Sequence, residues 1–131
     1  MMFSDAVMDR VVDPRYEGPL ESFTHHGVAG APGDGPYLEL WLDIEGGAIR
    51  RAAYRTYSCP AAVACGSMVA QLATGRSVEA MGRLTEADID LLLGGLPAGK
   101  EHCPRLAIAA LGKALRSAAG PGLPAGPEAP R

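Results

Sequence analysis

Two cysteines stand directly before a proline, at Cys59-Pro60 and at Cys103-Pro104, and His102 precedes the second pair. Proline suits the first position of a helix, so each cysteine is expected to cap the start of a helix. The unpaired amides and partial positive charge at a helix start favour a thiolate, which predicts that both thiol pKa values fall below about 8.5. A thiolate is the form that binds a metal ion or attacks sulfur.

A glycine-rich loop adds a carboxylate, Asp34, between Gly33 and Gly35. Two thiolates, one imidazole and one carboxylate satisfy a tetrahedral site for zinc or iron. The candidate metal ligands are therefore Asp34, Cys59, His102 and Cys103. The chain holds no Cys-x-x-Cys pair, and an aspartate between glycines is also typical of a plain turn.

The remaining candidates have simpler interpretations. Cys65 shares a helical stripe with Val69 and Leu72, which favours a place in the core. His25 and His26 fall in an irregular segment and are expected at the loop surface, where they stay additional candidate ligands.

The elements that must position these groups are a hairpin and several helices. Leucine or isoleucine alternates with other residues from position 37 to 44, and Glu45-Gly46-Gly47 forms a turn, which predicts a β-hairpin over 37–57 with one solvated face. Arg50, Arg51 and Arg55 are expected on that solvated face. Residues 15–36 show no usable period and are expected to be irregular.

The helices are indicated by caps and apolar periodicity. A short helix follows Ser4 and ends at Asp13-Pro14, and another runs from Pro60 to about residue 73. Further helices are expected to start at Ser77, at Thr85 through a capping box with Asp88, and at Pro104. Their expected apolar residues are Ile89, Leu92 and Leu93, and then Leu106, Ile108, Leu111 and Leu115. Residues 1–117 are thus predicted to form one α+β domain, with a small antiparallel sheet packed by the C-terminal helices.

Composition narrows the class of protein. The chain has 131 residues, 12 Lys+Arg against 15 Asp+Glu, and a net charge of −3, which gives no electrostatic signature of nucleic-acid or anionic-membrane binding. No apolar run approaches the roughly 20 residues of a membrane-spanning helix. Three cysteines are too few for a secreted disulfide framework, so a reducing cytoplasm is expected. Residues 118–131 are rich in Gly, Pro and Ala and are predicted to be a disordered tail.

Several segments together resemble one family. Residues 57–67 (YSCPAAVACGS) resemble the YGCGSAIASSS segment of the IscU/NifU-type iron–sulfur cluster assembly scaffolds, and residues 102–107 (HCPRLA) resemble their HCS-LA segment. Residues 13–18 (DPRYEG) resemble their NPRNVG, and residues 30–32 (GAP) resemble the GAP before the first family cysteine. Residues 75–77 (GRS) and 96–100 (LPAGK) follow in family order. The similarity covers about residues 8 to 117.

The resemblance implies a function for the chain as a scaffold rather than an enzyme. Cys59 and Cys103 match the second and third scaffold cysteines, and His102 matches the histidine between them. The family holds a transient [2Fe–2S] cluster, or zinc in many preparations, and takes persulfide sulfur from a cysteine desulfurase. The resemblance therefore implies iron, zinc or a [2Fe–2S] cluster at these residues, with Cys103 or Cys59 as persulfide acceptor. The loop 96–100 resembles the Leu-Pro-Pro-Val-Lys segment that an Hsp70-type chaperone binds in some members, with two of five positions different.

The chain departs from the family at one ligand. The family reads GAPACGD, whereas this chain reads GAPGDGP, so Asp34 or Gly33 stands where the first cysteine is expected. A carboxylate is a harder ligand than a thiolate and cannot carry a persulfide. Two alternatives follow: a zinc-binding module of the same fold that has lost cluster assembly, and a thiol enzyme with Cys59 or Cys103 as nucleophile and His102 as base.

Overall fold

The computed structural model describes residues 5–12, 15–31, 33, 35–57, 60–96 and 98–117, with the backbone alone at residues 11 and 12. The predictions for Asp34, Cys59 and the tail 118–131 lie outside these residues. The elements along the chain are α1 (Asp5–Val12), β1 (His25–Gly30), β2 (Tyr37–Glu45), β3 (Ala48–Tyr57), α2 (Pro60–Ala73), α3 (Val78–Met81), α4 (Glu86–Leu92) and α5 (His102–Arg116). None of the described helices is long and apolar enough to cross a membrane.

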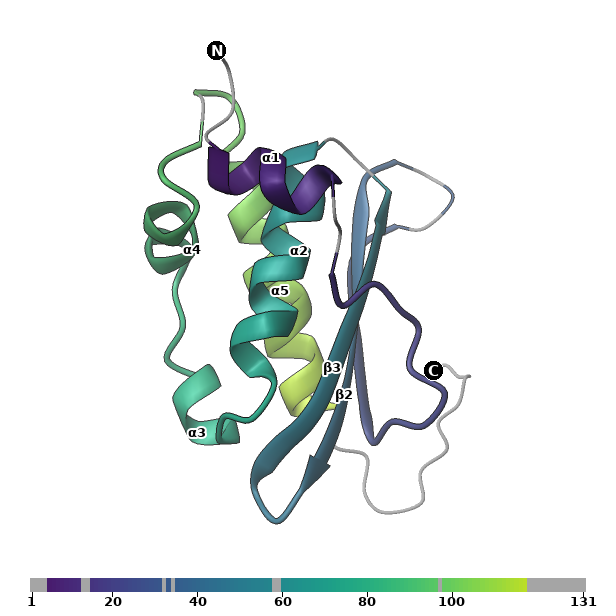
Figure 1. Cartoon of the computed structure of the whole chain (residues 1–131). Helices are drawn as coiled ribbons and strands as arrows, with labels where there is room; N and C mark the ends of the chain where they lie inside the picture. The colour runs from purple at the N-terminus through teal and green to yellow at the C-terminus, as the bar shows by residue number, and fades with distance from the viewer. Residues whose placement is uncertain are drawn as a thin grey trace.

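The strands form one antiparallel sheet in the order β1-β2-β3, and α2 and α5 cover one of its faces (Figure 1). Leu38, Leu40 and Leu42 of β2 are fully buried on this covered face. They lie opposite Thr56, Tyr54 and Ala52 of β3, as the alternation in the sequence predicted. The predicted α+β class and the hairpin over 37–57 are confirmed.

β1 corrects one prediction, because residues 25–30 form a strand within the segment expected to be irregular. Its sequence, HHGVAG, is short and rich in small residues, so it carries little strand signal. The reason for the small residues is the packing of α5. A Cβ on Gly27 would lie 2.5 Å from the carbonyl oxygen of Ala110 and closer still to the amide nitrogen of Ala114. Glycine at this position lets the helix backbone lie directly on the strand.

The outer face of the sheet is less exposed than predicted. Trp41 and Asp43 of β2 retain 5% and 8% of their surface, although both were expected on a solvated face. Gly18 lies against Trp41, and the Arg55 guanidinium stacks 5.2 Å from its ring centre. Hydrogen bonds from Gly18 to the Tyr54 carbonyl and from Tyr54 to the Tyr16 carbonyl bind this segment to the edge of β3. Residues 16–18, which are distant in sequence from β2, therefore cover part of the sheet face that the sequence predicted to be solvated.

The first turn of α5 also differs from the prediction. The helix begins at His102, preceded by Glu101 in helical conformation, so Cys103 is the second helical residue rather than the cap. The face of α5 that packs is made mainly of alanine, with Ala107, Ala110 and Ala114 fully buried. The predicted apolar residues Leu106, Ile108 and Leu115 are only partly buried, and Leu111 alone of that set is in the core. Close approach to β1 requires small side chains, which explains the difference.

The predicted caps of the short helices are confirmed. Ser77 accepts a hydrogen bond from the Ala80 amide at the start of α3. Thr85 and Asp88 form a reciprocal capping box at the start of α4, with hydrogen bonds of 3.2 and 3.0 Å. These contacts hold two short helices whose own length provides little stability.

Helix α1 is attached to α2 by a buried arginine. The Arg10 guanidinium donates hydrogen bonds to Ser67 Oγ at 3.0 Å and to Gln71 Oε1 at 2.6 Å. Ser67 in turn donates to the carbonyl of Arg15 at 3.1 Å. Burial, and then the charge of Arg15, lower the pKa of Arg10 from its ordinary value. Because Arg10 and Ser67 are both buried, their hydrogen bonds fix how the N-terminal segment lies on the domain.

Candidate metal centre

The predicted ligands belong to segments that meet at one end of the fold. The loop between β1 and β2, the end of β3, the start of α2 and the start of α5 all lie at the upper end in Figure 1. This arrangement follows from the antiparallel sheet and from α2 and α5 both starting there. It places the described neighbours of residues 34 and 59 at the same end of the sheet as residues 102–103, although these positions are up to about 70 residues apart in sequence.

His102 and Cys103 form the described part of this centre. His102 Nε2 lies 3.5 Å from Cys103 Sγ, so a sulfur and an imidazole nitrogen are held side by side. His102 is exposed, whereas Cys103 is fully buried in the first turn of α5, where its amide donates to the Lys100 carbonyl. A buried sulfur at a helix start with an exposed imidazole beside it offers one soft and one borderline ligand from a single rigid element.

The described residues around Asp34 show why glycine flanks it. Gly33 and Gly35 have φ values of 84° and 119°, in the region that glycine adopts without strain. A Cβ at either position would meet nothing within 4 Å, so backbone conformation rather than crowding requires glycine. Asp34 and Cys59 themselves lie outside the described residues, and their role as ligands stays a prediction.

Within the described ranges, no three His, Cys, Asp or Glu side chains come together as a metal-binding group. His102 and Cys103 supply two donors, and a tetrahedral site needs four. The two predicted donors that would complete the set, Asp34 and Cys59, come from segments whose described neighbours reach the same end of the sheet (Figure 1). The donor chemistry therefore fits zinc or iron, with two sulfurs, one nitrogen and one oxygen.

Cys65 is fully buried within α2 and belongs to the hydrophobic core, as its stripe with Val69 predicted. Val69 is equally buried. Because Cys65 is a buried core residue, it serves as an internal control in experiments on the thiols.

His25 and His26 are strand residues, which corrects their expected place on a loop surface. They start β1 opposite Leu42 and Trp41, whereas the site end of β1 is Gly30, opposite Tyr37. About five strand residues, or roughly 16 Å, separate the two ends.

Both histidines also have hydrogen-bond partners. His26 Nε2 is 2.8 Å from Glu39 Oε2, and His25 Nδ1 is 2.7 Å from Thr24 Oγ1. Burial lowers the pKa of His25. These contacts hold the histidines at the far end of the sheet from the candidate centre.

The arginines of β3 form cross-strand ion pairs, as expected for the outer sheet face. Arg51 pairs with Asp43 at 2.8 Å and Arg55 with Glu39 at 2.9 Å, while Arg50 pairs with Glu45. The second carboxylate oxygen of Glu39 is the partner of His26. These charges are satisfied within the sheet, which supports a structural role for them.

One surface feature was missed by the sequence interpretation. Leu92 was expected on the buried face of its helix, but it is 48% exposed, and the neighbouring Leu91 is 78% exposed. Only Ile89 and Leu93 of that region are fully buried. Three leucines in succession, at 91–93, cannot all face one side of a short helix, which is the signal that could have indicated an exposed apolar edge.

The chain belongs to the family described as the NifU-like N-terminal domain, whose model matches residues 2–119. It is 33% identical over 114 residues to the iron-sulfur cluster assembly scaffold protein IscU 1 of Archaeoglobus fulgidus, covering 87% of this chain and 74% of that protein. It is also 33% identical over 119 residues to the iron-sulfur cluster assembly scaffold protein IscU of Haemophilus influenzae, covering 88% of this chain and 94% of that protein. The family resemblance based on the motifs is confirmed.

A solved structure shows the same fold at low sequence identity. The putative iron-sulfur cluster assembly scaffold protein for the SUF system from Fervidobacterium islandicum superposes with a TM-score of 0.67 and 16% identity, covering 86% of this chain and 96% of that one. The curated relatives carry the description of scaffold proteins rather than of enzymes, in agreement with the prediction made for this chain.

Proposed function

We propose that this chain is a scaffold on which an iron–sulfur cluster is assembled, with Cys59, His102, Cys103 and Asp34 as its ligands. The observation that carries the proposal is the pairing of His102 Nε2 and Cys103 Sγ at 3.5 Å in the first turn of α5. This pair lies at the same end of the fold as the described neighbours of the other two candidate ligands (Figure 1). The cluster is cargo, so a mixed set of thiolate, imidazole and carboxylate ligands suits its release as well as its binding.

The two cysteines and the aspartate have different parts in this proposal. The thiolate of Cys103 or Cys59 attacks the outer sulfur of a persulfide on a cysteine desulfurase. A new S–S bond forms on the scaffold, and the desulfurase thiolate leaves. Asp34 supplies an oxygen ligand to iron but no sulfur-accepting atom, so sulfur enters through the two cysteines alone. A reducing cytoplasm, as expected from the cysteine content, keeps both thiols available.

The experiment is anaerobic incubation with ferrous iron, cysteine and a cysteine desulfurase, followed by desalting and visible absorption. We expect charge-transfer bands from a [2Fe–2S] cluster to stay with the protein and to disappear in Cys103→Ser and in Cys59→Ser. Cys65→Ala is the matched control, because it removes a thiol from the core and leaves the proposed ligands in place. Unchanged bands or metal content in Cys103→Ser would contradict the assignment.

A zinc-binding module of the same fold is the second candidate, and the absence of the first family cysteine favours it. Zinc accepts a mixed set of two sulfurs, one nitrogen and one oxygen. A colourless protein that keeps one zinc per chain after the same incubation would select this function. If the chain is a scaffold, an Hsp70-type chaperone is expected to bind the loop 96–100. A binding assay with a peptide of that loop as competitor tests this interaction.

A further inference from the structure

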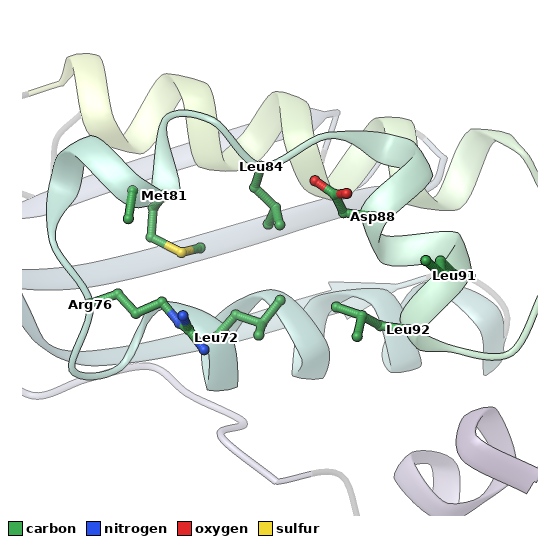
Figure 2. Close-up of a pocket in the computed structure, with 8 residues that line it drawn as sticks. Leu72, Arg76, Met81, Leu84, Asp88, Leu91 and Leu92 are labelled. Atoms are coloured by element: carbon green, nitrogen blue, oxygen red, sulfur yellow. The ribbon is translucent and has the colours of Figure 1, made fainter.

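Residues of α2, α3 and α4, with the turns that follow α2 and α3, line an apolar groove (Figure 2). Helices α3 and α4 lie on the side of α2 away from the sheet (Figure 1). The groove has a volume of about 370 Å³. Leu72 of α2, Met81 of α3 and Leu84 of the following turn point into it. None of these residues belongs to the candidate metal centre, so the inference below does not depend on the proposed function.

The rim of the groove carries exposed leucines next to this hollow. Leu91 and Leu92 of α4 line one end of it and are 78% and 48% exposed. Single exposed apolar residues are ordinary, but two adjacent leucines beside an apolar groove form a contiguous patch. Because these leucines project beside an apolar groove, the leucines of one copy of the chain can enter the groove of a second copy.

The charged residues of the groove lie at opposite ends. Arg76 lies at the end near α3, and Asp88 lies near α4, with the apolar side chains between them (Figure 2). Within the part of the chain that the structure describes, the Arg76 guanidinium forms no ion pair. Asp88 uses Oδ2 to accept the Thr85 amide in the capping box, which leaves Oδ1 for another partner.

We propose that this groove is a self-complementary interface between two copies of the chain, related by a two-fold axis across the groove. In such a contact, residue i of one copy meets residue j of the other, and j meets i. The rotation brings Arg76 of each copy to Asp88 of the other, and Leu91 of each copy into the groove of the other. The opposite charges at the two ends fit this antiparallel arrangement, which commits the surface to a second copy.

The first test measures mass against concentration. Sedimentation equilibrium from about 10 μM to about 1 mM covers the range in which weak interfaces associate. We expect the mass to rise from 13.6 kDa towards twice that value. Leu91→Gln should raise the dissociation constant at least about tenfold, because each dimer loses two buried leucines. Met8→Gln, at a half-exposed apolar residue of α1 that does not line the groove, is the matched control and should leave dimerisation unchanged.

A charge exchange tests the two-fold geometry itself. In a dimer of Arg76→Glu, an acid at position 76 would face Asp88 of the other copy at both symmetric contacts. In a dimer of Asp88→Arg, two arginines would face each other at both contacts. Each variant alone should therefore be monomeric. An equimolar mixture restores both opposite-charge contacts and should form a dimer, which also shows that the loss of the capping box has not unfolded α4. Arg83→Glu, at an exposed residue paired with Glu79 outside the groove, is the control for Arg76→Glu.

Two results would overturn the proposal. One is a monomer over the whole concentration range, including the case in which an amphipathic helical peptide of another protein binds the groove instead. The other is a dimer that neither Leu91→Gln nor the charge variants affect, which would place the interface elsewhere on the molecule.

Discussion

Gly27 of β1 is the position where the backbone of α5 lies directly on the sheet, and replacing it by alanine tests the account of this packing. The added Cβ would stand 2.5 Å from the Ala110 carbonyl oxygen and 2.9 Å from the Ala114 Cα. Carbon atoms normally pack at roughly 3.5 Å, so α5 must move by about 1 Å in Gly27→Ala. Because both neighbours are helix backbone, no side chain can rotate away to relieve the overlap.

The expected magnitude follows from this constraint. Overpacking a close-packed interior costs about 1–3 kcal/mol of unfolding free energy. We expect a cost at the upper end, about 3 kcal/mol, because the overlap is with helix backbone. For a domain of this length, each kcal/mol corresponds to roughly 3–4 °C, so Tm should fall by about 10 °C. Since α5 also carries His102 and Cys103, the variant should lose part of its metal retention as well.

Thermal unfolding followed by circular dichroism measures the effect. Gly112→Ala is the control within α5, because the atoms nearest to its Cβ among the described residues belong to the flexible end of Arg116, 3.1 Å away. Alanine is a better helix former than glycine, so this variant should gain about 0.5–1 kcal/mol. A Gly27→Ala protein that melts within about 2 °C of the parent chain would refute the close-packing argument, because that shift is under 1 kcal/mol.

Three further predictions concern stability. Thr85→Ala removes the capping box with Asp88 and should cost about 1 kcal/mol in urea unfolding, whereas no change would mean that the cap is irrelevant to α4. Ser67→Ala removes an acceptor of the buried Arg10 guanidinium and should cost about 1–3 kcal/mol; a loss under about 0.5 kcal/mol would show that α1 is not held by this contact. Tyr54 is fully buried, and its hydroxyl has no hydrogen-bond partner among the described residues. Burial raises its pKa to about 12, so the unfolded chain releases this proton first above pH 10, and stability should fall by roughly 1.4 kcal/mol per pH unit up to about pH 12. Tyr54→Phe should be neutral or more stable at pH 7 and should lack that decline; an identical pH profile in both proteins would contradict the assignment.

The residues proposed for the candidate site were selected from local signals in the sequence. The Cys-Pro steps at Cys59 and Cys103 and the adjacent His102 are readable from residue type alone. The placement of Cys103 as a cap was wrong by two helical positions, since the cap is Glu101 and the helix begins at His102. That shift leaves Cys103 in the first turn, where the helix amides act on it in the same way. The ligand roles of Asp34 and Cys59 stay predictions for the reconstitution experiment.

Local patterns in the sequence predicted the hairpin over 37–57, the capped starts of α3 and α4 and the core role of Cys65. Each of these depends on neighbours within a few residues, through alternation, side-chain capping or helical periodicity. Only the tertiary structure decided that His25 and His26 lie in β1, that alanines rather than leucines of α5 face the sheet, and that Trp41 is covered. The physical reason is that these features depend on contacts between segments far apart in the chain. At Gly27, α5 can approach the strand because glycine has no side chain. A glycine adds nothing to the apolar periodicity of the sequence, so this contact could not be predicted from it.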